Sequence, residues 1–404
     1  MSENRKKEQL NIKSDFAIKI RIREEEENYF GDEKKKRHRL ETRSRTVAIM
    51  AIAAAVIYTM VIILPNGMSA TNRLSVSWFF EVLRGNIEAL ADLIGGNANY
   101  MKINMIRTAA AGLAGAALSV SGAVYQGSFK NAMASPTTLG VQSGGVMGGM
   151  IYVMLIYAQK VSAAKNDADT MSIFQKYEMS FFVLAGCFFA VALIVTLSKI
   201  VGRGRVSSVA LILSGFVFSG FIGGIEELVQ YRMLLENTYD DRTYLLRYMM
   251  MGSFDRVASL EQLLIMGIPI VIGIGIIIFL RNRINILVFG EEEAKTMGIN
   301  AERERNIIVA VVTAITAVVI SFCGMIGFAG FIIPHMARRF TGPDFRYLIP
   351  ASALLGADIM MFVYYAATCF NYSTSINFMT SLAGGLIFLY MLIRFRSRKN
   401  ADWA

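Results

Sequence analysis

Residues 107–145 read RTAAAGLAGAALSVSGAVYQGSFKNAMASPTTLGVQSGG, an apolar stretch rich in small residues that runs directly into a polar turn. Ala111, Gly115 and Ser119 recur every four residues, so they share one face of a helix. Small residues on one face allow close backbone approach, which is how helices associate in lipid. The turn Asn131–Gly140 places non-helical backbone near the membrane boundary, where only protein or water can satisfy it. This segment favours a membrane transport protein.

The rest of the chain extends this interpretation. Of its 404 residues, 54% are hydrophobic, which predicts a polytopic, all-α membrane protein. The run at 306–333 is too long for one comfortable crossing and contains glycines, so we divide it into a helix ending near Cys323 and a short returning helix. With this division we expect ten transmembrane helices, from apolar runs at residues 47–64, 105–125, 140–158, 180–198, 208–225, 263–280, 306–333, 347–370 and 378–393.

The net charge of +10 follows the same topology. The tail before Val47 and the end after Ile393 are both basic, which predicts that both termini lie in the cytoplasm and that the chain resides in the cell membrane. We divide the chain into a charged cytoplasmic tail (1–46), a transmembrane permease domain (47–396) and a cytoplasmic C-terminal tail (397–404). The tail is expected to be disordered or locally helical. Because topology explains most of the charge, no nucleic-acid partner is predicted.

No motif for metal or nucleotide chemistry is evident in the sequence. Cys187, Cys323 and Cys369 fall in or beside apolar runs without paired spacing, so we interpret them as packing residues. His38 and His335 cannot form a zinc site from their spacing alone. The phosphate-binding pattern G-x-x-x-x-G-K-[ST] does not occur. We therefore predict no metal, no cofactor and no catalytic residue in this chain, and any ATP would be hydrolysed by a separate subunit.

Three further segments resemble parts of a transporter. FGEEEAKTMGI (289–299) has the composition of a short amphipathic helix in a cytoplasmic loop, which an ATPase could displace as a rigid body. A solvated charged loop is the alternative. GMIGFAGFIIPHMARRFTGPDFR (324–346) fits a helix hairpin with a basic cytoplasmic end, and SLAGGLIFLYMLIR (381–394) places a glycine pair in the last helix.

Together, these segments and the stretch at 107–145 resemble the FecCD permease family, the membrane subunits of ABC importers for ferric siderophores, haem and cobalamin. The resemblance covers about residues 100–395 and includes LILSGFVFS at 211–219, which is similar to the family's fifth helix. It implies a ten-helix protomer that pairs with a second permease subunit, with the pathway along the dimer axis. It also implies two ATP-binding subunits and an external solute-binding protein as partners.

The resemblance assigns candidate roles by position. The residues expected to couple to the ATPase are Gly290, Glu291, Glu292, Ala294, Met297 and Gly298. The cytoplasmic gate loops contain Asn131, Ser135, Pro136, Gly140, Arg203 and Arg205. The pathway is lined by Ser214, Ser219, Gly384 and Gly385, and Arg107 is expected to dock the solute-binding protein.

This chain also departs from the family pattern. The Arg-x-Pro-Arg that precedes the second helix in family members is replaced by residues 104–107, of which only Arg107 keeps the charge. The Asp and Arg that close the ninth helix are absent from YYAATCF at 364–370, and Gly-Ala-Pro of the last helix is replaced by residues 384–386. We therefore favour a heterodimer in which this protomer meets the binding protein differently from its partner.

Two other classes of function remain open. An ion-coupled secondary transporter or channel would use Asp358, Glu226 and Glu227. Placing a carboxylate inside a membrane helix costs free energy of insertion, so such residues often mark an ion pathway. Asp358 could instead form a helix–helix hydrogen bond. A membrane sensor that transports nothing would depend on residues 1–45. The favoured function is ATP-driven import of a ferric siderophore, with haem and cobalamin as further candidates.

Overall fold

The computed structural model describes residues 41–54, 56, 98–157, 173–204, 208–235, 246, 249–369 and 376–396. The chain forms two units, residues 1–49 and 50–404, and residues 41–54 are helical. Further elements are α4 (Ala98–Ser128), α5 (Val141–Tyr152), the π-helical η1 (Val153–Tyr157), α7 (Ile173–Val201), α8 (Ser208–Leu235), α10 (Leu260–Phe289), α11 (Glu291–Thr296), α12 (Ala301–Cys323), α13 (Ala329–Thr341), α14 (Phe345–Cys369) and α15 (Ile376–Arg396). The prediction of an all-α fold is confirmed for the described residues.

The helices match the apolar runs of the sequence. Within the described part, α4, α7, α8, α10, α12 and α14 are long and apolar enough to cross a membrane, and residues 141–156 and 376–390 form shorter apolar helices. The division of the long run is also confirmed, because α12 ends at Cys323 and α13 begins at Ala329. The first predicted crossing, 47–64, lies half outside the described residues, which include only 47–54 and 56 of it.

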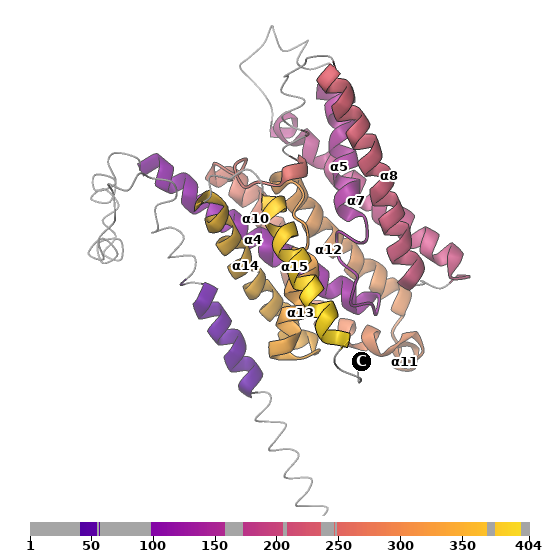
Figure 1. Cartoon of the computed structure of the whole chain (residues 1–404). Coiled ribbons are helices and arrows are strands. Elements are labelled where there is room, and N and C mark those ends of the chain that lie inside the picture. Colours follow the sequence, from indigo (N-terminus) through magenta and orange to yellow (C-terminus); the bar gives the residue numbers. More distant parts are fainter. Residues whose placement is uncertain are drawn as a thin grey trace, which may run out of the picture. The chain divides into compact units, whose positions relative to one another are not determined.

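Helix α4 is the central element of the larger unit and packs against α10, α12, α13 and α14 (Figure 1). Its small residues make this possible. A Cβ atom at Gly115 would overlap the carbonyl oxygen of Gly356 on α14, and one at Gly122 would overlap the carbonyl oxygen of Gly330 on α13. The close approach predicted from the small-residue face is therefore present.

Buried hydrogen bonds connect α4 to α12. The Ser121 hydroxyl lies 2.8 Å from the carbonyl oxygen of Ala117 and accepts from the Thr316 hydroxyl at 3.0 Å. One helical turn further, the hydroxyl oxygens of Tyr125 and Thr313 lie 2.8 Å apart. Each of these four hydroxyl groups thus has a partner inside the helix bundle, as burial favours.

Helices α5, α7 and α8 form a second group that lies side by side (Figure 1). Glycines again set the spacing, because Cβ atoms at Gly144 on α5 and Gly186 on α7 would each overlap the other's carbonyl oxygen. Large apolar side chains along α8 remain exposed, with Phe216 76% exposed and Phe221 66% exposed. This face of α8 is available to lipid or to a partner helix.

Candidate functional site

The turn between α4 and α5 (residues 129–140), named here the gate turn, is compact and internally hydrogen-bonded. Asn131 accepts a hydrogen bond from the Met133 backbone N–H at 2.8 Å through its side-chain oxygen. The Thr138 hydroxyl accepts from the Ser135 backbone N–H at 2.8 Å. Gly140 closes the turn with φ +63°, a left-handed conformation that favours glycine. The polar residues of the turn therefore satisfy its non-helical backbone.

The gate turn also packs against the membrane helices on both sides. A Cβ at Gly330 would lie 2.8 Å from the Pro136 ring, which seats the turn on the start of α13. On the other side, a Cβ at Gly215 of α8 would overlap the carbonyl oxygen of Thr138. The turn thus joins α13 to α8.

A cavity of about 440 Å³, named here the pathway cavity, lies where the gate turn meets α5, α8, α15 and the segment before α13. Its polar lining consists of hydroxyl and amide groups, and none of its lining side chains carries a charge. The Ser219 hydroxyl is buried and has no hydrogen-bond partner among the described residues. The lining residues are Thr137, Thr138, Gln142, Ser143, Ile212, Phe216, Ser219, Met325, Gly327, Phe328, Asn377 and Ser381.

The predicted pathway residues separate into three groups. Ser219 lines the pathway cavity, whereas Ser214, five residues earlier on α8, does not. Gly384 lines a smaller neighbouring cavity and packs against Phe328. Gly385 has no atom within 4 Å of the position that a Cβ would take. Sequence reasoning missed Gln142 and Asn377, although each is a polar residue at the start of an apolar helix.

Asn377 at the start of α15 ties together two chain segments at the edge of the pathway cavity. Its side-chain oxygen accepts from the Gly327 backbone N–H at 2.8 Å, and its amide nitrogen donates to the Met250 carbonyl at 3.0 Å. A backbone hydrogen bond, donated by the Met325 N–H to the Met249 carbonyl at 2.7 Å, connects the same two segments. The non-helical segment 324–328 is therefore held from α15 and from the segment before α10.

The predicted coupling residues lie in α11 and directly before and after it. Ala294 is fully buried, whereas Met297 is 59% exposed and Glu292 is exposed. Glu291 is the first residue of α11, and Gly298 follows the helix with φ +75°. Gly290 precedes the helix with φ +149°. Exposed residues available to a partner are thus present on α11 and directly after it.

The start of α11 lies close to the gate turn, and α12, the next helix, is hydrogen-bonded to the end of α4. A Cβ at Gly290 would overlap the Glu293 carboxylate and would lie 3.2 Å from the ammonium nitrogen of Lys130 in the gate turn. The Arg305 guanidinium on α12 donates to the Ser128 carbonyl at the end of α4, at 3.1 Å. The Gly290 end of α11 therefore lies beside Lys130 of the gate turn.

The other predicted residues are placed as follows. Arg203 lies in the turn after α7 with φ +52°, and Arg205 lies outside the described residues. Arg107 lies 3.0 Å from the Asp255 carboxylate of its own chain, a partner that sequence reasoning did not identify. Glu226 and Asp358 are buried on α8 and α14, and neither lines the pathway cavity.

Comparison with known proteins places this architecture in a family. The sequence model of the FecCD transport family matches residues 55–394. The chain belongs to the FecCD transport family. The family resemblance of the sequence is thereby confirmed, and this FecCD protein is a permease subunit of an ABC transporter.

Individual relatives agree with this assignment. The FecCD protein is 29% identical over 283 residues to a cobalamin import permease of Halobacterium salinarum, a match that covers 69% of each chain. It is 30% identical over 298 residues to an iron(3+)-hydroxamate import permease of Bacillus subtilis, covering 73% of this chain and 71% of the relative. A solved structure described as an inward-facing metal-chelate type ABC transporter shares the fold, with a TM-score of 0.67 and 23% identity, covering 87% of this chain and 99% of that one.

Proposed function

We propose that this FecCD protein is the membrane permease of an ATP-driven importer whose cargo is a ferric chelate. The observation that carries the proposal is the pathway cavity, which is large, uncharged and lined by hydroxyl, amide and apolar groups. A bulky chelate crosses most readily where the lining offers weak polar contacts, because conduction requires that the cargo also be able to leave. The relatives named for iron(3+)-hydroxamate and cobalamin import support this class of cargo.

Coupling to an ATPase is supported by the position of α11. Its exposed residue Glu292 and the adjacent Met297 are available to a partner, while buried Ala294 anchors the helix. The Lys130 and Gly290 contact connects this region to the gate turn. We infer that two ATP-binding subunits bind ATP, move α11 as a rigid body and so change the gate turn.

An ion-coupled mechanism has less support. Such a transporter would present carboxylates to the transported ion. Glu226, Glu227 and Asp358 are absent from the lining of the pathway cavity, which contains no acidic residue. The family assignment also favours ATP-driven transport.

The remaining partners follow from the proposed import function. We propose that a second permease subunit completes the pathway against the exposed apolar face of α8, and that a different chain takes this place, because the docking arginines expected before α4 are reduced to Arg107. An external solute-binding protein would deliver the cargo. With α11 facing the ATPase, both termini are expected in the cytoplasm.

Reconstitution tests the proposal directly. The FecCD protein is reconstituted in vesicles with an ATPase subunit, a second permease subunit and a binding protein, and uptake of ⁵⁵Fe-labelled ferric hydroxamate is measured. We expect uptake only when ATP, ATPase and binding protein are all present. Uptake by this chain alone, driven by a proton or sodium gradient, would contradict the proposal.

Crosslinking tests the coupling step separately. A photoreactive amino acid at Glu292 is expected to crosslink to the ATPase subunit. The matched control is a photoreactive residue at Phe279, which is 81% exposed on α10 and lies in the apolar part of that helix. Crosslinking to the ATPase from Phe279 and not from Glu292 would place the coupling surface elsewhere.

A further inference from the structure

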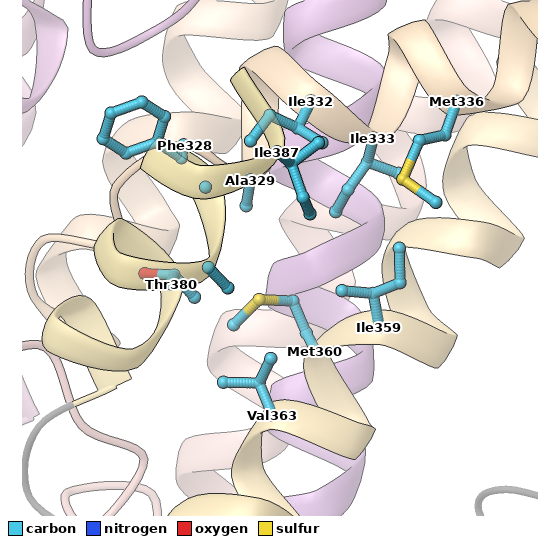
Figure 2. A pocket seen from close by; sticks show the side chains of 12 residues that line it. Phe328, Ala329, Ile332, Ile333, Met336, Ile359, Met360, Val363, Thr380 and Ile387 are labelled. Carbon is cyan, nitrogen blue, oxygen red and sulfur yellow. The ribbon is translucent and has the colours of Figure 1, made fainter. Parts of the chain in front are cut away.

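Phe328, the residue before α13, lines two cavities at once. One is the pathway cavity, and the other is an apolar cavity of about 60 Å³ between α13, α14 and α15. No other residue is shared by the two linings. Figure 2 shows the Phe328 ring at the edge of the apolar cavity, apart from Met360 and Val363. The other lining residues of the apolar cavity are Ala329, Ile332, Ile333, Met336, Ile359, Thr380, Ala383, Gly384 and Ile387.

The backbone of Phe328 is strained. Its φ of 60° and ψ of −23° lie in the left-handed region, which is unusual for an aromatic residue. Among the described residues, the other non-glycine residues with positive φ are Lys130 and Arg203, both in turns after helices. Strained conformations persist where the surroundings over-determine them, and they cluster at clamps and switches.

The surrounding contacts hold this backbone in place. Gly327 N–H donates to the Asn377 side chain at 2.8 Å, and the Gln142 amide donates to the Ile326 carbonyl at 2.6 Å. On α15, a Cβ at Gly384 would overlap Cβ and Cγ of Phe328. The backbone is therefore anchored on both sides, while the ring is only partly buried and borders empty space.

Phe328 also lies within the depth of the membrane. Helix α13 contains 13 residues, which is about 20 Å at 1.5 Å per residue and less than the roughly 30 Å hydrocarbon core. Its basic end, at Arg338 and Arg339, is cytoplasmic by the predicted topology. The start of α13 is thus inside the membrane, where non-helical backbone is tolerated beside a cavity.

We propose that Phe328 is the hydrophobic constriction of the transport pathway. With its ring in the pathway cavity the path is closed, and with its ring turned into the apolar cavity the path is open. A ring that moves between a partly polar cavity and an apolar one can gate by excluding water. The strained, anchored backbone keeps the pivot fixed during this movement. The inference rests on the proposed transport function of the same cavity.

Passive leakage tests this role without requiring ATP-driven uptake. The assembled importer is placed in vesicles loaded with calcein, and dye release is measured without ATP. We expect Phe328→Ala to increase release several-fold, Phe328→Leu to increase it less, and Phe328→Trp to remain as tight as the parent. Parent-level release from a correctly assembled Phe328→Ala importer would overturn the proposal, whatever the result for uptake.

Phe331→Ala is the matched control. Phe331 is 9% exposed on the same helix, packs against Phe388 on α15 with ring centroids 5.3 Å apart, and lines neither cavity. We expect no additional leakage from this variant. Equal leakage from Phe331→Ala and Phe328→Ala would overturn the proposal, because it would reflect general loosening of α13 against α15.

Thiol labelling provides a second readout if Phe328→Ala fails to assemble. A cysteine at position 328 is treated with a charged methanethiosulfonate reagent in the nucleotide-free and ATP-bound importer, with the unsubstituted importer as background. Native Cys187 and Cys323 are buried. We expect strong labelling in one nucleotide state and several-fold protection in the other. Equal labelling in both states would overturn the proposal.

Discussion

The Arg107 guanidinium lies 3.0 Å from the Asp255 carboxylate and donates a second hydrogen bond to the Asp255 backbone carbonyl at 3.2 Å. This pair joins the N-terminal half of α4 to the segment that precedes α10. Both side chains are about one-quarter exposed, at 26% and 24%. The charge expected to meet a binding protein is therefore engaged within its own chain while remaining accessible from outside.

A double-mutant cycle on this pair separates stability from docking. For stability, we expect Arg107→Ala and Asp255→Ala to show a coupling energy of about 0.5–1 kcal/mol, because the pair is partly exposed to solvent. For docking, Arg107→Ala should weaken binding of the solute-binding protein and Asp255→Ala should strengthen it, since the freed arginine becomes available. Equal weakening by both substitutions would assign the pair a structural role only. The measurements are thermal inactivation in detergent and binding-protein affinity.

The glycine contact between α4 and α13 predicts a sharp difference between two alanine substitutions. Gly122→Ala places a methyl group on the carbonyl oxygen of Gly330, so a helix must shift, and overpacking of this kind costs about 1–3 kcal/mol. Gly275→Ala is the control, because a Cβ at this position of α10 meets no atom within 4 Å. The half-life of the purified protein at elevated temperature should fall for Gly122→Ala and stay unchanged for Gly275→Ala.

Removal of the Asn377 side chain should loosen the start of α15. Asn377→Ala leaves the Gly327 N–H and the Met250 carbonyl without this partner, at a cost of about 1 kcal/mol, because both hydrogen bonds are only partly buried. Ser381→Ala should cost less, because its hydroxyl makes only a 3.3 Å contact with Asn377. Limited proteolysis and thermal inactivation measure the difference, and equal sensitivity of the two variants would contradict the prediction.

The contact between Lys130 and Gly290 predicts partial uncoupling. Lys130→Met removes the ammonium group beside the start of α11 while keeping a side chain of similar length. In the reconstituted importer we expect ATP hydrolysis to continue while cargo uptake per ATP falls several-fold. Arg339→Met is the control, since Arg339 is exposed near the C-terminal end of α13. Parallel loss of hydrolysis and uptake in Lys130→Met would instead indicate an assembly defect.

A substitution at Ser219 distinguishes a structural from a transport role for its hydroxyl. The group is buried without a hydrogen-bond partner among the described residues, so Ser219→Ala should leave stability unchanged or raise it slightly. If the hydroxyl contacts passing cargo, uptake of ferric hydroxamate should fall in the same variant. Loss of stability together with uptake would show that the hydroxyl has a structural partner.

Local patterns in the sequence were sufficient for the helices and for the interruption near Cys323. The thickness of the membrane limits the length of one crossing, and glycines mark where a helix can end, so run length and glycine placement predict the separation of α12 from α13. The close-packing face of α4 was equally visible, because a four-residue spacing of small side chains acts within one helix.

The residues of the candidate site could be predicted only in part from the sequence. Family position selected Ser219, which lines the pathway cavity, but also Ser214, which does not. Gln142, Asn377 and Phe328 were not identified, because nothing in the local sequence states which side chains of α5, α15 and the segment before α13 converge. Which side chains meet in the cavity depends on the angles and positions at which whole helices cross, and these are set by tertiary packing.

By itself, the sequence determined an all-α membrane protein, the approximate positions of its apolar helices and its family, since these depend on hydrophobicity, spacing and turn residues along the chain. Only the tertiary structure decided that Arg107 pairs with Asp255, that Lys130 lies beside Gly290, and that Phe328 separates two cavities. These relationships join residues that are distant in the chain. Their partners are selected by helix packing, where each carbonyl, glycine and ring must fit the atoms of another helix.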